Sequence, residues 1–196
     1  MLKKILLVVL AVVVVFVLYV ATRPSTFRIE RSAPVAAPPA VVYGQLVDFH
    51  RWSAWSPWAH LDPHMSVQYG GAPSGQGAVY EWNGNDKVGQ GRMTIVEARP
   101  PEAVAIKLEF MKPWSQTNRS EFLLRPEAGG TRVTWTMTGE NDFVGKAFGV
   151  FMNMDKLIGA DFEKGLATLR TVAEEASVKA QQPPEAAPAA AAPPAH

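Results

Sequence analysis

An apolar run near the N-terminus constrains this chain more than any other feature of its sequence. Residues 5–21 carry no charge and no strongly polar group, and Lys3 and Lys4 directly precede them. At about 1.5 Å per residue, a helix over this run would be roughly 25 Å long, close to the short limit for crossing a bilayer. The run therefore predicts a transmembrane helix within an N-terminal membrane anchor over residues 1–25.

A cleaved secretory signal is the alternative interpretation of the same run. The best cleavage position follows Ala21, but Tyr19 then lies three residues before the cut, where signal peptidases prefer a small residue. Under the positive-inside rule, Lys3 and Lys4 place the rest of the chain across the membrane. Arg23 and Arg28 lie on the far side and weaken that bias.

The remaining sequence predicts one globular domain over residues 26–179, followed by a disordered tail over 180–196. The tail is rich in proline and alanine, and such a composition buries too little apolar surface to offset the entropy of ordering. The chain has 19 basic and 18 acidic residues, a balance that argues against a nucleic-acid partner. It has no cysteine, which excludes disulfides and thiolate metal sites.

Alternating apolar and polar residues predict a mostly antiparallel β domain after the anchor. Residues 26–32 form a first predicted strand, and residues 40–49 have the spacing of a short helix after two prolines. Six further runs separated by turn residues indicate a meander. These runs cover residues 65–69, 78–83, 88–98, 103–111, 117–125 and 132–138.

Charges and apolar residues suggest how the later strands pair. Placing Glu109 opposite Arg119 aligns opposite charges on one face of the sheet. The next pairing places Phe122 near Trp135 on the other face. The sequence thus predicts a sheet with one apolar, aromatic face.

A helical period returns after Gly139. Apolar residues recur at intervals of three or four between 151 and 172, which predicts a long C-terminal helix. One helix over 142–176 would be about 52 Å long, so we expect a break near Gly145, Gly149 or Asn153. Gly159 and Gly165 within it indicate either close packing or space for a ligand.

Several motifs resemble those of the START-like superfamily, also called SRPBCC or polyketide cyclase/dehydrase and lipid transport proteins. The resemblance extends over residues 27–176, and within the superfamily the chain is similar to a membrane-anchored bacterial subgroup. Its motifs are Ala33-Pro34, Pro38-Pro39, Asp48-Phe49 with Trp52, Trp55 and Trp58, and the segments 77–84, 89–93 and 130–135.

The resemblance implies an α+β helix-grip fold. In this fold a curved antiparallel sheet, here of about seven strands, wraps around the C-terminal helix and leaves a cavity between them. Together with the apolar run and the positive-inside rule, the resemblance to a membrane-anchored bacterial subgroup predicts a single-pass protein of the bacterial inner membrane, with the C-terminal domain outside the cytoplasm. The fold alone does not specify a ligand or a reaction.

Aromatic and methionine residues of the predicted sheet and helix are the candidate ligand-binding site. They would form an apolar wall against a small hydrophobic or lipid-like molecule, and flexible thioethers suit such a wall. A plain filled core is the alternative. The residues are Trp82, Met93, Phe110, Trp135, Met137, Phe151, Met154, Ile158 and Phe162.

Three tryptophans, Trp52, Trp55 and Trp58, are spaced three apart and would lie on one face of a helical turn. They either pack the short helices against the sheet, or form a lid over the cavity, or rest on the bilayer, where indoles are favoured.

Candidates for catalysis are few. Glu81 and Asp48 are the two carboxylates that could act as proton shuttles. Alternation, however, places Glu81 on the other face of the sheet from Trp82, where Arg92 can pair with it. His60 and His64 lack the spacing and the third ligand of a metal site. No phosphate loop, dinucleotide fingerprint or nucleophile elbow occurs, so we expect neither metal nor cofactor.

These observations favour a non-enzymatic, membrane-tethered protein that binds a hydrophobic molecule. A cyclase or dehydratase acting on a polyketide-like substrate is the second hypothesis. A structural or regulatory module with a filled core is the third.

Overall fold

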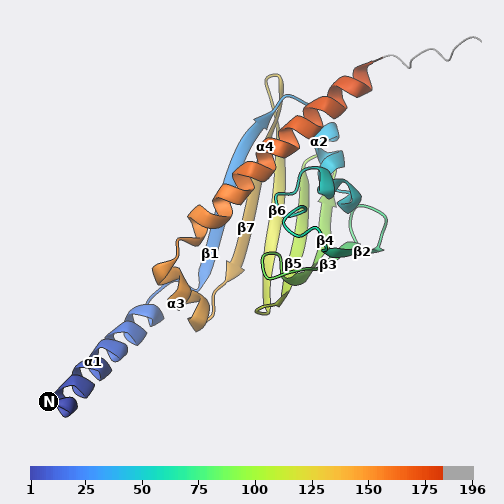
Figure 1. Ribbon diagram of the computed structural model, residues 1–196. Helices are drawn as coiled ribbons and strands as arrows, with labels where there is room; N and C mark the ends of the chain where they lie inside the picture. Colours follow the sequence, from blue (N-terminus) through green and yellow to red (C-terminus); the bar gives the residue numbers. More distant parts are fainter. Residues whose placement is uncertain (183–196) are drawn as a thin grey trace, which may run out of the picture.

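The computed structural model describes residues 1–182 and contains one seven-stranded antiparallel sheet with helices on one side (Figure 1). The strands are β1 (Thr26–Val35), β2 (Ser66–Gly71), β3 (Ala78–Asn83), β4 (Gln90–Arg99), β5 (Ala103–Lys112), β6 (Gln116–Glu127) and β7 (Gly130–Glu140). Their spatial order is β1-β7-β6-β5-β4-β3-β2, so the six later strands form a meander and β1 pairs with the last of them. The predicted helix-grip fold is confirmed.

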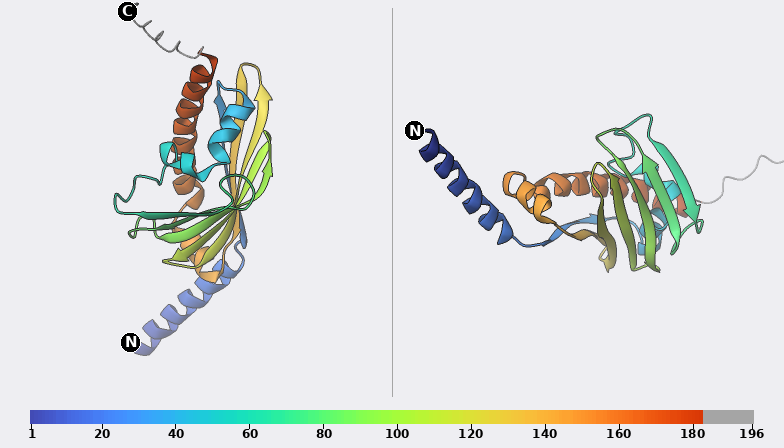
Figure 2. Two further views of the ribbon diagram at one scale, coloured as in Figure 1. Left: turned by 90° about the vertical axis from the view of Figure 1, so that its right-hand side faces the viewer. Right: turned by 90° about the horizontal axis from the view of Figure 1, so that it is seen from below.

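The helices are α1 (Leu2–Ala21), α2 (Pro39–Leu46), the 3₁₀ helix η1 (Phe49–Ala54), α3 (Phe143–Phe151) and α4 (Met154–Gln181). The sheet curves around α4, which crosses its concave face together with α2 (Figure 2). α1 extends away from the domain, is exposed along nearly its whole length, and is long and apolar enough to cross a membrane. The predicted tail, apart from its first three residues, lies outside the described part of the chain.

Local sequence explains where the short helices begin and end. Pro39 occupies the first turn of α2, where its missing N–H costs nothing. The predicted helix over 40–49 is instead two elements, because the Asp48 carboxylate accepts a hydrogen bond from the backbone N–H of His50 and starts η1. The long C-terminal helix breaks at the predicted Asn153, whose side chain caps α4 by accepting from the Lys156 N–H at 2.9 Å.

Stacked aromatic rings form the centre of the core between sheet and α4. The rings of Trp135 and Phe162 lie 4.0 Å apart and nearly parallel, and Phe122 lies against Trp135 at 4.8 Å between centroids. Gly165 allows this approach, since a Cβ there would come within 2.9 Å of the Trp135 ring and 3.0 Å of Pro57. This glycine therefore serves close packing rather than a gap.

One strand register was predicted correctly and one was not. Phe122 pairs with Trp135, as predicted for β6 and β7. Between β5 and β6, however, Arg119 lies opposite Lys107 instead of Glu109, a shift of two residues. The charges are balanced differently: Lys107 pairs with Glu109 on its own strand, and Arg119 pairs with Glu97 of β4.

Candidate ligand-binding site

A cavity of about 300 Å³ lies between the concave face of the sheet, the segment around η1 and the first half of α4. Seven of the nine predicted ligand-binding residues line it. They are Trp82, Met93, Phe110, Trp135, Met137, Ile158 and Phe162.

The other two predicted residues lie elsewhere. Phe151 ends α3 and is 77% exposed, with its ring 5.8 Å from that of Phe16 in α1. Met154 begins α4 and is also exposed. Both precede the part of α4 that crosses the sheet, because the helix breaks at Asn153, so neither contributes to the cavity wall.

Several wall residues were not predicted. Alternation places Tyr80 on the same face of β3 as Trp82, and Leu108 on the same face of β5 as Phe110. That signal was available in the sequence. The contributions of Met65 and of Tyr69 were not foreseeable, because they depend on how far the edge strand β2 curves toward η1.

The three tryptophans around η1 belong to the core and the cavity wall. Trp52 and Trp55 are 4% and 2% exposed, and their indole N–H groups donate to the backbone carbonyls of Leu46 and Gln45. Trp52 and Trp58 line the cavity, and the Trp58 ring contacts both Trp135 and Phe162 edge-on. The structure thus corrects the lipid-facing interpretation for Trp52 and Trp55, which are buried packing residues.

Two indole N–H groups of the wall are hydrogen-bonded within the protein. The Trp135 indole donates to the Ser120 hydroxyl at 2.9 Å, and the Trp82 indole donates to the Val88 carbonyl at 2.9 Å. Lys87 and Asp161 border the cavity as its charged members. The interior therefore suits an apolar molecule, with any polar group directed to the rim.

The phenol of Tyr80 reports on how dry the wall is. Burial, with a smaller contribution from Tyr69, raises the pKa of Tyr80 to about 12. An unfolded tyrosine ionises near pH 10, so between about pH 10 and 12 the unfolded chain releases this proton first. Ionisation of Tyr80 in the unfolded chain therefore lowers the free energy of unfolding as the pH rises from about 10 to 12.

We expect the difference between ultraviolet titrations of the wild type and Tyr80→Phe to show one phenol ionising near pH 12. A difference midpoint near pH 10 would mean that Tyr80 is solvated and that the wall is wet.

Neither predicted carboxylate reaches the cavity. Glu81 lies on the outer face of β3, where Arg92 Nε donates to it at 2.6 Å. Desolvation raises the pKa of Asp48, but hydrogen bonds from the backbone and ring of His50 outweigh this and leave the pKa below its usual value. Asp48 thus caps η1 in its ionised form and lies outside the cavity lining.

The segment around His60 and His64 has a structural role. The Asp62 carboxylate accepts the backbone N–H groups of His64 at 2.9 Å and Asn85 at 2.7 Å, which holds this loop against the turn between β3 and β4. These bonds lower the pKa of Asp62. Within residues 1–182, no group of three or more potential metal ligands comes together.

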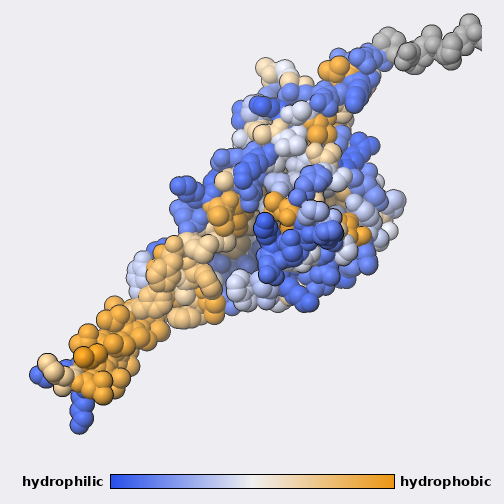
Figure 3. Space-filling model, viewed as in Figure 1, coloured by the Kyte–Doolittle hydropathy of each residue, from blue (hydrophilic) through white to orange (hydrophobic). Residues whose placement is uncertain are grey.

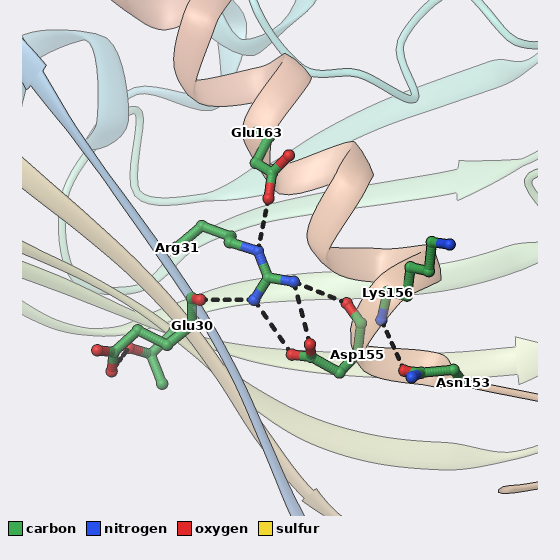
Figure 4. A network of polar contacts seen from close by, with 7 residues as sticks. Glu30, Arg31, Asn153, Asp155, Lys156 and Glu163 are labelled. Atoms are coloured by element: carbon green, nitrogen blue, oxygen red, sulfur yellow. Dashed lines mark hydrogen bonds and ion pairs between the residues drawn. The ribbon is translucent and has the colours of Figure 1, made fainter.

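An ion-pair network fixes the cavity-lining half of α4 over the sheet (Figure 4). Arg31, on the concave face of β1, donates to the Glu163 carboxylate at 2.8 Å and to both carboxylate oxygens of Asp155 at 3.1 Å. It also donates to the Asp155 backbone carbonyl at 3.0 Å. Gly159 leaves the space for the guanidinium, so this glycine also serves close packing.

Removal of this network is expected to loosen α4. Arg31→Met should lower the Tm of the full-length protein more than Arg28→Met, which removes an exposed pair with Glu30 on the opposite face of the same strand. The Arg31 guanidinium holds the pKa of Asp155 below its usual value, so this contribution should be lost as the pH falls through that pKa. Thermal unfolding at neutral and acid pH measures both effects, and equal losses for the two variants would contradict the assignment.

A larger hollow of about 900 Å³ lies at the end of the sheet next to α1, over its outer face. Its lining includes Arg28, Lys107 and Arg119, and it is broadly open to solvent. The smaller cavity is the better candidate site because its wall is mainly apolar and it lies between packed layers.

Comparisons with known proteins agree with this geometry. The profile of the family described as "Polyketide cyclase / dehydrase and lipid transport" matches residues 26–174. No curated protein matches the chain.

Solved structures share the fold at low sequence identity. An uncharacterised protein from Rhizobium leguminosarum has a TM-score of 0.56 and 13% identity over 76% of this chain and 95% of its own. A protein of unknown function from Staphylococcus aureus has a TM-score of 0.56 and 14% identity, covering 80% and 97%. The di-domain ARO/CYC StfQ from the steffimycin biosynthetic pathway has a TM-score of 0.56 and 12% identity, covering 77% of this chain and 51% of StfQ.

Proposed function

Because this chain belongs to the polyketide cyclase/dehydrase and lipid transport family, we propose that it is a membrane-tethered, non-enzymatic binding protein for a small hydrophobic or lipid-like molecule. The observation that carries this proposal is the apolar, aromatic-walled cavity beneath α4. Its wall residues, Trp82, Met93, Phe110, Trp135, Met137, Ile158 and Phe162, are the proposed ligand contacts.

The position of the cavity relative to α1 supports a lipid-like ligand. β1 starts at Thr26, directly after the anchor, and pairs there with Glu140 at the end of β7. Along the meander, the same end of the sheet contains the end of β5 and the start of β4. Cavity residues Met137, Phe110 and Val88 lie within a few residues of these strand ends. A cavity at the anchor end can exchange apolar molecules with the bilayer over a short path.

The expected affinity is modest. If a ligand buries about 300 Å² of apolar area, the gain is roughly 7 kcal/mol at about 25 cal/mol per Å², before association costs. We therefore expect binding in the micromolar range.

The anchor is proposed to remain uncleaved in a bacterial inner membrane, with residues 26–179 as the ligand-binding domain outside the cytoplasm. Val20, near the end of α1, is fully buried, and Phe16 lies against Phe151. These contacts join α1 to the domain, which favours a retained anchor over a removed signal peptide.

Native mass spectrometry of the full-length protein, released from detergent micelles after purification from its host, tests this function. We expect a bound apolar molecule in the wild type and its loss in Met93→Trp, which fills the cavity. Arg92→Trp is the matched control, because Arg92 lies next to Met93 but is exposed on the outer face of β4. Absence of any bound molecule in the wild type and Arg92→Trp would contradict the proposal.

A cyclase or dehydratase acting on a hydrophobic, polyketide-like substrate is the second candidate. The family description and the fold shared with StfQ support it, and Tyr80 and Asp161 provide a phenol and a carboxylate in the wall. Turnover of a copurified molecule that is abolished in both Tyr80→Phe and Asp161→Asn would favour this alternative over simple binding.

A further inference from the structure

The end of the domain next to α1 carries an apolar surface that no strand or helix within residues 1–182 covers. We call it the α3 surface and define it by Phe143, Val144, Phe148, Phe151 and Met152 on and after α3, together with Trp114 in the turn between β5 and β6. Trp114 is 69% exposed and Phe151 77% exposed, and the others are about half exposed. Soluble proteins seldom expose so many large apolar side chains together, so this surface calls for a partner.

The α3 surface is continuous with α1. The ring of Phe151 lies 5.8 Å from that of Phe16, and the Trp114 ring lies 5.8 Å from that of Phe148. Figure 3 shows the apolar colouring of α1 continuing onto the adjacent part of the domain. A partner that surrounds α1 would therefore reach α3 as well.

The geometry specifies how deep α3 would lie. Phe16 is five residues before the end of α1 at Ala21, which corresponds to roughly 7.5 Å along the helix axis. Amphipathic helices that lie in the membrane interface bury their apolar side about 5–10 Å into it. Phe151, whose ring lies 5.8 Å from that of Phe16, would be held at a comparable depth.

Composition agrees with a lipid environment. The one charged residue within α3 is Lys146, and the carboxylate at its start, Asp142, caps the helix by accepting the Gly145 N–H at 2.7 Å. The indole of Trp114 suits the boundary between headgroups and acyl chains.

We propose that the α3 surface is inserted in the interfacial region of the same bilayer that α1 spans. This inference rests on the proposed membrane tethering and adds a second contact to it. Without lipid contact on α3, only the packing at the end of α1 and the four residues between α1 and β1 would orient the domain relative to the membrane. The second contact fixes the orientation and holds the anchor end of the sheet, with the cavity, at the lipid surface.

Spin-label accessibility in the full-length protein tests the insertion. The chain has no cysteine, so single-cysteine variants need no background substitutions. The variants are Phe151→Cys on the α3 surface, Val13→Cys within the span and Arg125→Cys at the exposed far end of β6, each in vesicles of phosphatidylcholine and phosphatidylglycerol. The measurement compares collision of each label with apolar oxygen and with a water-soluble nickel chelate.

We expect the oxygen-to-nickel collision ratio at Phe151→Cys to be several-fold higher than at Arg125→Cys and to approach that of Val13→Cys. A water-like ratio at Phe151→Cys with a lipid-like ratio at Val13→Cys would overturn the inference but leave the anchor intact. Water-like ratios at both would overturn the membrane tethering itself. A Phe151→Cys label shielded from both reagents, with dipolar broadening between copies, would show a second chain on this surface and also overturn the inference.

Discussion

Trp135→Ala is expected to lower the free energy of unfolding by about 3–5 kcal/mol, as for other large aromatic residues removed from a core. Trp135 is 2% exposed, stacks on Phe162, and contacts the rings of Trp55 and Phe122. Its loss also leaves the Ser120 hydroxyl without its hydrogen-bond donor. Such a change removes much of the roughly 5–15 kcal/mol that stabilises a typical protein.

Urea unfolding of the full-length protein in detergent, followed by circular dichroism, measures this loss. Trp114→Ala is the matched control, because Trp114 is exposed and lies outside the core. Its effect in detergent should be below about 0.5 kcal/mol. Similar midpoints for the two variants would contradict the assigned core.

Gly91→Ala is expected to disrupt both the fold and the cavity. A Cβ at this position would come within 2.5 Å of the Glu109 carbonyl of β5 and would overlap the ring of Trp82. Overpacking of this kind costs about 1–3 kcal/mol, and the displaced Trp82 ring would enter the cavity. We expect lower stability together with weaker ligand binding.

Gly44→Ala provides a control of opposite sign. Gly44 lies inside α2, and a Cβ added there would meet no atom within 4 Å, so alanine should stabilise the helix by about 1 kcal/mol. Unfolding midpoints of the two variants should therefore move in opposite directions. A stabilising Gly91→Ala would show that β4 and β5 lie further apart than their pairing here implies.

Most of the fold could be predicted from local sequence patterns, because the alternation of apolar and polar residues follows directly from the burial of one face of a strand or helix. Period-two alternation identified the strands and placed Trp82, Phe110 and Trp135 on the cavity face. The predicted β5–β6 register differs from the observed one by two residues, because Arg119 pairs with Glu97 on β4 rather than with Glu109 directly across from it. A shift of two residues keeps every side chain on the same face of the sheet, so the residues predicted to face the cavity still do so.

The elements that were missed depend on tertiary position rather than on sequence period. Phe151 and Met154 continue the helical stripe but lie beside the break at Asn153, so they face away from the sheet. Trp52 and Trp55 have the amphipathic side chains of a membrane belt, yet their indoles bond carbonyls of α2 inside the core. Trp114 is separated from α3 by nearly thirty residues, and only the sheet pairing brings them together.

The central claim, a hydrophobic ligand in the cavity beneath α4, is tested most directly by thermal unfolding with a panel of fatty acids, sterols and aromatic polyketides. A ligand at about 100 times its Kd stabilises the folded state by about 2.7 kcal/mol, which raises the Tm by several degrees. The account predicts such a rise for at least one compound in the wild type and in Arg92→Trp, and none in Met93→Trp. No rise with any compound, or an equal rise in Met93→Trp, would contradict it.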